Sequence, residues 1–257
     1  MTWRWPTCFS RCNRASFGRL GRPGGLPYIA LLMIPSLIAG TVSGTVELTN
    51  SKDAAVRKHR DYSGVVIWLE PLDKPVPAMI ARRVEMAQRD KQFLPHVIAI
   101  ELGSTVAFPN FDPIFHNAFS NFSGQPFDVG LYPPRTSRAV TFTHAGIVRV
   151  FCNIHSTMSA VIAVLHTPWF AVSQPTGKYT ILNVPSGDYQ LHLFHERALQ
   201  ENLQFLERRI TLPDADLTLP LISITETGFL PVPHLNKFGK DYPPVASDST
   251  YPGAPRR

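Results

Sequence analysis

Short apolar runs, separated by turn residues, dominate the chain after its first forty positions. Within these runs Val, Ile and Phe alternate with polar residues, while Gly, Asn and Pro stand at the edges. This pattern is typical of strands in a β-sandwich. The runs in the first part of the chain occupy residues 43–49, 64–70, 96–103, 105–110, 138–143 and 147–151.

The sequence pattern changes at about residue 168, where a second group of strands is predicted. KYTILNVPSGDYQLHLFHE, residues 178–196, contains a Val-Pro-Ser-Gly-Asp-Tyr turn that leads one strand straight into the next. Two windows interrupt the β pattern: residues 78–91 predict a short helix, and residues 198–209 read as a partly helical insertion. From about residue 225 the chain is rich in Pro, Gly and Ser and is predicted to be loosely ordered.

The predicted fold class is all-β, with one sandwich followed by a second, smaller one. We leave open whether the first two strands belong to the earlier or the later sandwich. The predicted divisions are a signal peptide at 1–40, an N-terminal β-hairpin region at 41–77, the first sandwich at 78–167, the second at 168–224 and the tail at 225–257.

The N-terminal segment has the pattern of an export signal. Five arginines and no acidic residue precede Pro23, and an apolar run of about 15 residues follows, too short for a typical membrane span and interrupted by Pro35. Small residues at Ala39, Gly40 and Gly44 offer a cleavage site. We expect a periplasmic or otherwise extracytoplasmic protein without a membrane span in the mature chain. Retention of the leader as an anchor is the alternative.

The formal net charge of +6 does not indicate nucleic-acid binding. Much of the excess lies in terminal arginines, and Lys, Arg, Asp and Glu are interspersed between the termini. A protein that follows a phosphate backbone would show a basic stripe with interleaved aromatic residues instead. We therefore expect no nucleic-acid partner.

One cysteine remains after the leader. Cys8 and Cys12 fall in the segment expected to be removed, which leaves Cys152 and no possible disulfide within the mature chain. A lone thiol in an oxidising compartment favours a metal ligand or a nucleophile.

The residues around Cys152 favour a metal ligand. FCNIHSTM places Cys152, His155 and Met158 at intervals of three, directly after a predicted strand, and His116 lies upstream in FPNFDPIFHNAFS. A type 1 copper centre uses two imidazoles, one thiolate and a weak axial thioether. His116, Cys152, His155 and Met158 supply that set, so the sequence predicts one mononuclear copper ion.

Other interpretations of these residues exist. A catalytic thiol would need a base, an orienting group and an oxyanion site, and the sequence offers no oxyanion site that we can name. Structural zinc prefers more thiolates and does not use a thioether, and a binuclear purple copper site would need a second loop cysteine. His116 could be a hydrogen-bonded loop residue and Met158 core packing, while His96 is expected to be a packed or capped histidine. The same reading applies to His144, His166, His192, His195 and His234.

The combined pattern resembles the cupredoxins, specifically the amicyanin and plastocyanin group. DPIFHNAFS and VRVFCNIHSTMSA are similar to exported cupredoxin-domain proteins labelled methylamine utilisation proteins, over residues 44–196. The resemblance implies a Greek-key sandwich. It also implies that Asn117 ties the two ligand loops together, with its backbone amide near the thiolate, and that His155 is the ligand nearest the surface.

The second unit resembles the carboxypeptidase regulatory-like, transthyretin-like sandwich. The matching positions, which that family uses as framework and not for catalysis, are Gly177, Tyr179, Ile181, Pro185, Gly187 and Tyr189.

The function expected from these resemblances is single-electron transfer by an exported blue copper protein, an electron carrier and not an enzyme. The expected partner is a redox protein of unknown identity, which would meet a rim formed by Pro113, Ile114 and the Ser156-Thr157 turn. The alternatives are a copper-binding or storage protein, a cell-envelope binding module that transfers no electrons, and a structural sandwich with a vestigial site.

Overall fold

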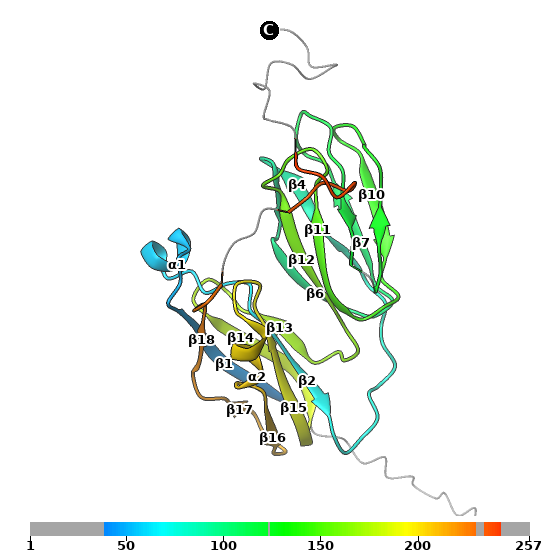
Figure 1. Ribbon diagram of the computed structural model, residues 1–257. Helices are drawn as coiled ribbons and strands as arrows, with labels where there is room; N and C mark the ends of the chain where they lie inside the picture. Colours follow the sequence, from blue (N-terminus) through cyan, green and yellow to red (C-terminus); the bar gives the residue numbers. More distant parts are fainter. Residues whose placement is uncertain (1–38, 123, 230–233, 243–257) are drawn as a thin grey trace, which may run out of the picture. The chain divides into compact units, whose positions relative to one another are not determined.

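The strands build two β-sandwiches, which draw on different parts of the chain (Figure 1). The computed structural model of the chain describes residues 39–122, 124–229 and 234–242. We call the sandwich whose strands lie within residues 83–165 the inserted sandwich. The split sandwich is the other one, because its strands lie within residues 39–71 and 170–225, on either side of the inserted one in the sequence. The predicted all-β fold class is confirmed.

The split sandwich joins the first two strands to the last six. One sheet has the order β14-β1-β17, with β18 also paired to β1, and the other has the order β13-β2-β15-β16. The sequence left open which sandwich the first two strands join, and these pairings place both in the split sandwich. Its strands are β1 (Ala39–Thr49), β2 (Val66–Pro71), β13 (Phe170–Val172), β14 (Lys178–Pro185), β15 (Gly187–Phe194), β16 (Arg208–Leu212), β17 (Leu217–Thr218) and β18 (Ile222–Thr225).

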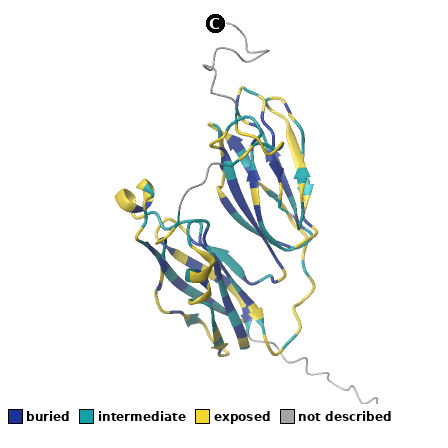
Figure 2. Cartoon of the chain, in the orientation of Figure 1, coloured by how far each residue is buried: buried dark blue, intermediate teal, exposed yellow. Residues whose placement is uncertain are grey.

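Alternation of buried and less buried residues explains why β1 forms a strand of this sandwich. Every second residue from Gly40 to Leu48 is buried, which is the period of a pleated strand with one face in the core. Val42, Val46 and Leu48 pack there with residues of both sheets, among them Ile67 and Tyr189. Figure 2 shows the buried positions, in dark blue, along the strands of both sandwiches.

The inserted sandwich contains all strands between β2 and β13. Its sheets have the orders β10-β7-β3 and β6-β12-β11-β8-β9, and β4 and β5 form a hairpin. The strands are β3 (Arg83–Glu85), β4 (Ala87–Arg89), β5 (Gln92–Leu94), β6 (Val97–Glu101), β7 (Thr105–Pro109), β8 (Phe119–Ser120), β9 (Phe127–Asp128), β10 (Ser137–Thr141), β11 (Gly146–Phe151) and β12 (Ser159–Leu165).

Strand β12 is apolar throughout because both of its faces are covered. Ala160, Ile162 and Val164 face the core of the inserted sandwich, which also contains Cys152. Val161, Ala163 and Leu165 belong to a separate apolar cluster that includes residues of β6 and β2. A strand buried on both faces loses the alternation seen in β1. The β12 strand in turn fixes β11, its antiparallel neighbour, and so the start of the loop that carries Cys152.

The helix predicted for residues 78–91 is wrong. This stretch instead holds β3, which pairs in parallel with β7, and β4, which pairs with β5. Val84, Met86 and Gln88 point inward at every second position, a strand period, and sheet pairing overrides the local helix propensity. Two short helices lie elsewhere, α1 (Ala54–His59) and α2 (Gln200–Gln204), the second within the predicted insertion.

The two ends of the chain differ in how far the structure describes them. The predicted signal peptide falls almost wholly on residues 1–38, outside the described residues. Residues 234–242, which fall in the tail predicted to be loosely ordered, hydrogen-bond to the inserted sandwich. No helix in the described part of the chain has the length and apolar character needed to cross a membrane.

Two neighbouring residues of β14 test the core of the split sandwich. The Ile181 side chain is 1% exposed and Leu182 is 61% exposed, on the opposite face of the same strand. We expect Ile181→Ala to lower the free energy of unfolding by about 2–5 kcal/mol, because it leaves a cavity, and Leu182→Ala to change it by less than about 0.5 kcal/mol. Urea titration followed by tryptophan fluorescence measures both, since Trp68 and Trp169 lie in this sandwich. Equal losses would contradict the assigned faces of β14.

Candidate metal centre

Three side chains with metal-binding atoms meet at one end of the inserted sandwich. The Sγ atom of Cys152 lies 3.9 Å from Nδ1 of His116 and 3.7 Å from Nδ1 of His155. All three atoms lie within 4.8 Å of one another, and in the described part of the chain this is the one group of at least three His, Cys, Asp or Glu side chains so placed. The structure therefore brings together three of the four ligands predicted from the sequence.

Two loops deliver these residues. Cys152 follows β11 directly, and the loop from Cys152 to Met158 returns into β12. The Cys152 N–H donates to the Met158 carbonyl at 3.1 Å, and the Met158 N–H donates to the His155 carbonyl at 3.1 Å. These bonds close the loop on itself, so that Cys152 and His155 face the same point.

His116 enters from the loop after β7 and is fixed by its backbone. Its N–H donates to the Tyr132 carbonyl at 3.2 Å, and the Tyr132 N–H donates back to the His116 carbonyl at 2.9 Å. The His116 side chain is fully buried. Because both backbone groups are paired, the ring has little freedom except rotation about its own bonds.

Met158, the predicted axial ligand, lies at the end of the loop. It is 1% exposed and packs in the same core cluster as Cys152. Its role as a ligand stays a prediction, because burial in this cluster suits a core methionine equally well.

Asp112 is the polar partner of His116 and was not singled out from the sequence. Its Oδ2 atom lies 2.7 Å from Nε2 of His116. The backbone N–H groups of Asp90 and Lys91, in the β4–β5 turn, donate to its two oxygens at 2.6 and 2.9 Å. The one sequence signal is the spacing Asp-x-x-x-His in FDPIFH, which is too common to indicate a pair without the fold.

The electrostatics of this pair favour a neutral histidine beside a charged aspartate. Burial alone would raise the pKa of Asp112, but the N–H of Lys91, the His116 ring and the N–H of Asp90 outweigh it and hold the pKa below its usual value. Burial lowers the pKa of His116, although Asp112 opposes that effect. With Nε2–H donating to Asp112, the lone pair of Nδ1 faces Cys152.

The Cys152 thiol is buried among apolar side chains but faces several backbone N–H groups. Burial raises the pKa of the thiol, while the N–H groups of Ile154, Asn117 and His155 act in the opposite direction. A thiolate with these donors around it and two imidazole nitrogens beside it is a suitable ligand for a soft or borderline metal ion. The donor set therefore fits copper, the metal predicted from the sequence.

Asn117 connects the two ligand loops. Its Oδ1 accepts the N–H of Asn153 at 3.2 Å, next to Cys152. Its Nδ2 donates to Asp128 at 2.7 Å and to the Gly130 carbonyl at 3.1 Å. One side chain therefore ties the His116 loop, the Cys152 loop and the segment after β9 to each other.

The rim of the site is partly apolar and exposed. His155 is half-buried, whereas Cys152, His116 and Met158 are buried. Near His116 in the sequence, Phe111 and Phe115 are 53% and 39% exposed. Pro113, Ser156 and Thr157 are exposed, and Ile114 is half-buried.

Comparison with solved structures finds cupredoxin-containing proteins, while no family model and no curated protein matches the chain. A copper-containing nitrite reductase from Thermus scotoductus is 26% identical, with a TM-score of 0.32, over 37% of this chain and 25% of that one. A mutant of amicyanin in its Cu(I) form is 16% identical, with a TM-score of 0.31, over 32% of this chain and 81% of that one. A purple cupredoxin from Nitrosopumilus maritimus is 21% identical, with a TM-score of 0.27, over 30% of this chain and 84% of that one. This chain thus spans a quarter of the nitrite reductase and about four fifths of the two smaller proteins.

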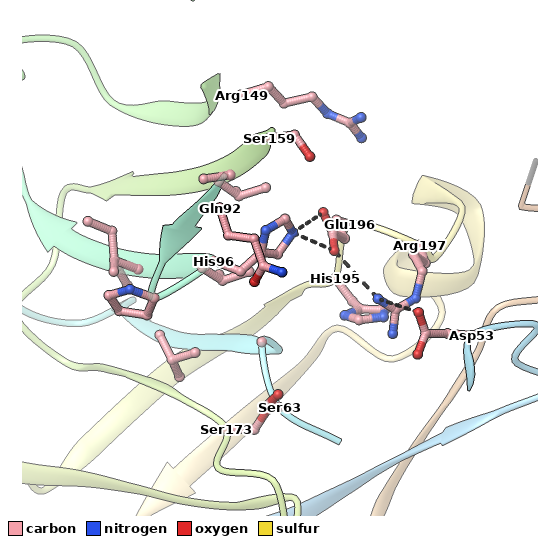
Figure 3. Close-up of a pocket in the computed structure, with 18 of the residues that line it drawn as sticks. Asp53, Ser63, Gln92, His96, Arg149, Ser159, Ser173, His195, Glu196 and Arg197 are labelled. Carbon is pink, nitrogen blue, oxygen red and sulfur yellow. Dashed lines mark hydrogen bonds and ion pairs between the residues drawn. The ribbon is translucent and has the colours of Figure 1, made fainter. Parts of the chain in front are cut away.

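His96, expected from the sequence to be a packed or capped histidine, has a carboxylate partner. Its Nε2 lies 2.9 Å from both side-chain oxygens of Glu196, and Arg197 lies 3.5 Å from the same carboxylate. Figure 3 shows this pair on the wall of a cleft that Arg149 and Ser159 also line. His96 follows β5 and Glu196 follows β15.

The other histidines singled out from the sequence lie outside this group of three side chains. His144 and His166 are exposed. His192 stacks on Trp68, with ring centroids 5.1 Å apart. His195 is 2% exposed and pairs with Glu226 at 3.0 Å, and His234 stacks on Phe151.

The His96–Glu196 pair predicts a pH dependence of stability. The hydrogen bond to Glu196 raises the pKa of His96 above 6.5, its ordinary value. The stabilisation of the folded state by this pair is therefore complete below pH 6.5, and it is lost as the pH rises through the raised folded-state pKa of His96. The Glu196 pKa is lowered, so that carboxylate stays charged throughout this window. We expect the parent chain to lose more thermal stability between pH 6 and pH 9 than His96→Gln does, by a small margin because the His96 side chain is 43% exposed.

Thermal unfolding midpoints at the two pH values measure this difference, with the exposed His144→Gln as the matched control. His144→Gln should keep the parent's dependence. Identical slopes for the parent and His96→Gln would show that the pair does not contribute to stability.

Proposed function

We propose that this chain is an exported protein with one mononuclear type 1 copper centre that carries single electrons. His116, Cys152 and His155 would hold the copper, and Met158 would supply the axial thioether. The observation that carries the proposal is the cluster of one buried thiol and two imidazoles, whose candidate ligand atoms all lie within 4.8 Å of one another. Two imidazoles and one thiolate are the equatorial ligands of a blue copper site.

The surroundings of the donors support a metal ligand set over a catalytic thiol. His116 Nε2 is taken by Asp112, which orients Nδ1 toward Cys152. An outer partner of this kind is the usual support of a metal-binding histidine. A nucleophilic cysteine would need access to substrate, but Cys152 is fully buried.

Bound copper would supply the change between Cu(II) and Cu(I). The residues of the chain keep the donors in place while that change occurs. Asn117 links the two loops, the bonds between Cys152, His155 and Met158 close one of them, and paired backbone groups fix His116. Because little needs to move, the reorganisation accompanying electron transfer should be small.

The exposed rim supports an exchange of electrons with a protein partner. His155 is the half-buried member of the group and directly precedes the exposed Ser156–Thr157 turn. Phe111, Phe115 and Pro113 add exposed apolar surface on the His116 loop. We place the electron path at His155 and the docking of a redox partner on this rim, in an extracytoplasmic location.

Copper loading tests the proposal directly. The chain from Gly40 onward, with Cu(II) added, should show an intense thiolate-to-copper absorption band and a narrow hyperfine splitting in electron paramagnetic resonance. Cys152→Ala should lose both because it removes the thiolate, whereas the exposed His144→Ala should keep them. A colourless protein with ordinary tetragonal copper signals would refute the electron-carrier proposal.

A second measurement on the loaded protein separates a carrier from a storage protein. A carrier should retain its copper through repeated reduction and oxidation. Loss of Cu(I) to a moderate chelator within a few cycles would favour storage or delivery.

Asp112 gives a separate prediction. Three N–H groups, from Asp90, Lys91 and His116, point at its two oxygens. Asp112→Asn has only one acceptor oxygen, so at least one of these donors loses its partner and the His116 ring is no longer held. We expect copper affinity to fall about 10–100-fold, measured by chelator competition. The exposed Asp214→Asn is the matched control, and an Asp112→Asn affinity within twofold of the parent would contradict the assigned role.

A further inference from the structure

The segment from His234 to Tyr242, which we call the strap (red in Figure 1), contacts three consecutive residues where β11 ends and the Cys152 loop begins. The His234 ring stacks on Phe151 with centroids 4.3 Å apart and planes 27° apart. The Tyr242 hydroxyl donates to the Cys152 carbonyl at 2.7 Å. The Lys237 N–H donates to Oδ1 of Asn153 at 2.9 Å.

The strap is ordered by its own hydrogen bonds. The Asn236 side-chain oxygen accepts the N–H groups of Phe238 and Lys240 at 2.9 and 3.1 Å. The Asn236 N–H donates to the Lys240 carbonyl, and the Gly239 N–H donates to the Asn236 carbonyl, both at 2.9 Å. Gly239 has a φ of 69°, which glycine adopts without strain. The turn therefore presents Lys237 and Tyr242 from a defined backbone.

Lys237 closes a ring of hydrogen bonds through both ligand loops. Its ammonium lies 2.7 Å from Oδ2 of Asp128, whose other oxygen accepts Nδ2 of Asn117 at 2.7 Å. The Asn117 side chain accepts the Asn153 N–H, and the Asn153 side chain accepts the Lys237 N–H. The ring runs from Lys237 to Asp128, Asn117, Asn153 and back, so the strap holds the same network that joins the two loops.

Tyr242 engages the backbone of the thiolate ligand itself. The Cys152 N–H is bonded to the Met158 carbonyl, and the Cys152 carbonyl is bonded to Tyr242. His234 Nδ1 lies 3.1 Å from the Tyr242 hydroxyl and helps to fix it.

We propose that Tyr242 and Lys237 are positioning residues of the copper centre. They hold the Cys152 loop from outside the sandwich and thereby set the reduction potential of the copper centre. This inference rests on the proposed function. A loop without the strap could adapt to the geometry of each oxidation state and admit water. Water favours the more highly charged Cu(II), so loss of the strap contacts should lower the potential.

The test compares three variants of the chain from Gly40 onward. Tyr242→Phe keeps the ring and removes only the hydroxyl, and Lys237→Met keeps the stem and removes the charge. Lys240→Met makes the same charge change at an exposed position of the strap and is the matched control.

Two readouts keep the inference separate from the proposed function. In the copper-free chain, amide hydrogen exchange of residues 152–158 should be about fivefold faster in Tyr242→Phe, the factor expected for loss of one hydrogen bond of ordinary net strength. In the copper-loaded chain, Tyr242→Phe and Lys237→Met should have a lower reduction potential and a shifted thiolate-to-copper band. Lys240→Met should match the parent in both experiments.

Two results would overturn the inference, and they are distinguishable. If Tyr242→Phe and Lys237→Met match Lys240→Met in exchange and in potential, the strap does not position the loop, even though the copper centre stands. If exchange rises but the parent chain itself forms no type 1 centre, the strap holds a loop that is not a copper loop, and the proposed function fails as well.

Discussion

The hydrogen bond from the Asn153 N–H to the Asn117 side chain is the interaction on which the metal site depends. Cys152 and His116 come from loops 36 residues apart. The adjacent strands β11 and β8 pair at Phe151 and Phe119, so the sheet brings the two loops near each other. The bond between Asn153 and Asn117 then fixes the loops themselves, which carry the thiol and the imidazole. A buried donor or acceptor left without its partner costs about 1–3 kcal/mol, so the protein is held to the one arrangement in which both loops meet.

The two histidines of the site have different surroundings, which gives them different roles in the proposed centre. His116 is fully buried, with paired backbone groups and a carboxylate on its outer nitrogen. His155 lies on a short closed loop and is half-buried. The buried ring is suited to holding a metal ion still, and the half-buried ring is suited to passing charge to the outside. The contrast follows from the fold: one ring lies between strands and the other lies on the turn of a hairpin.

Much of the site could be predicted from the sequence because its signal is local. Cys152, His155 and Met158 lie within one short loop after a strand of clear β pattern, and the HNAF stretch marks His116 and Asn117. Asp112 could not be predicted as a partner, because it is held by N–H groups of the β4–β5 turn, in a stretch that reads locally as a helix. The strap could not be predicted either, since it lies in a tail whose Pro- and Gly-rich composition is typical of disorder. Its order comes from one asparagine, Asn236, and from contacts with Asn153 and Asp128. The pairing of β1 with β17 and β18 could not be predicted from local sequence patterns either, although the strands themselves could be.

The pairing of β1 also bears on the order in which the chain can fold. Ser43 and Thr218 face each other across 175 residues, whereas every pairing of the inserted sandwich lies between Arg83 and Leu165. Closing a long loop costs more conformational entropy than closing a short one, and chains dominated by distant contacts fold slowly. The inserted sandwich should therefore form first. Its formation brings Pro71 and Phe170, the ends of the strands that flank it, closer together, so that the ligand-bearing sandwich acts as the folding nucleus for the sandwich built around it.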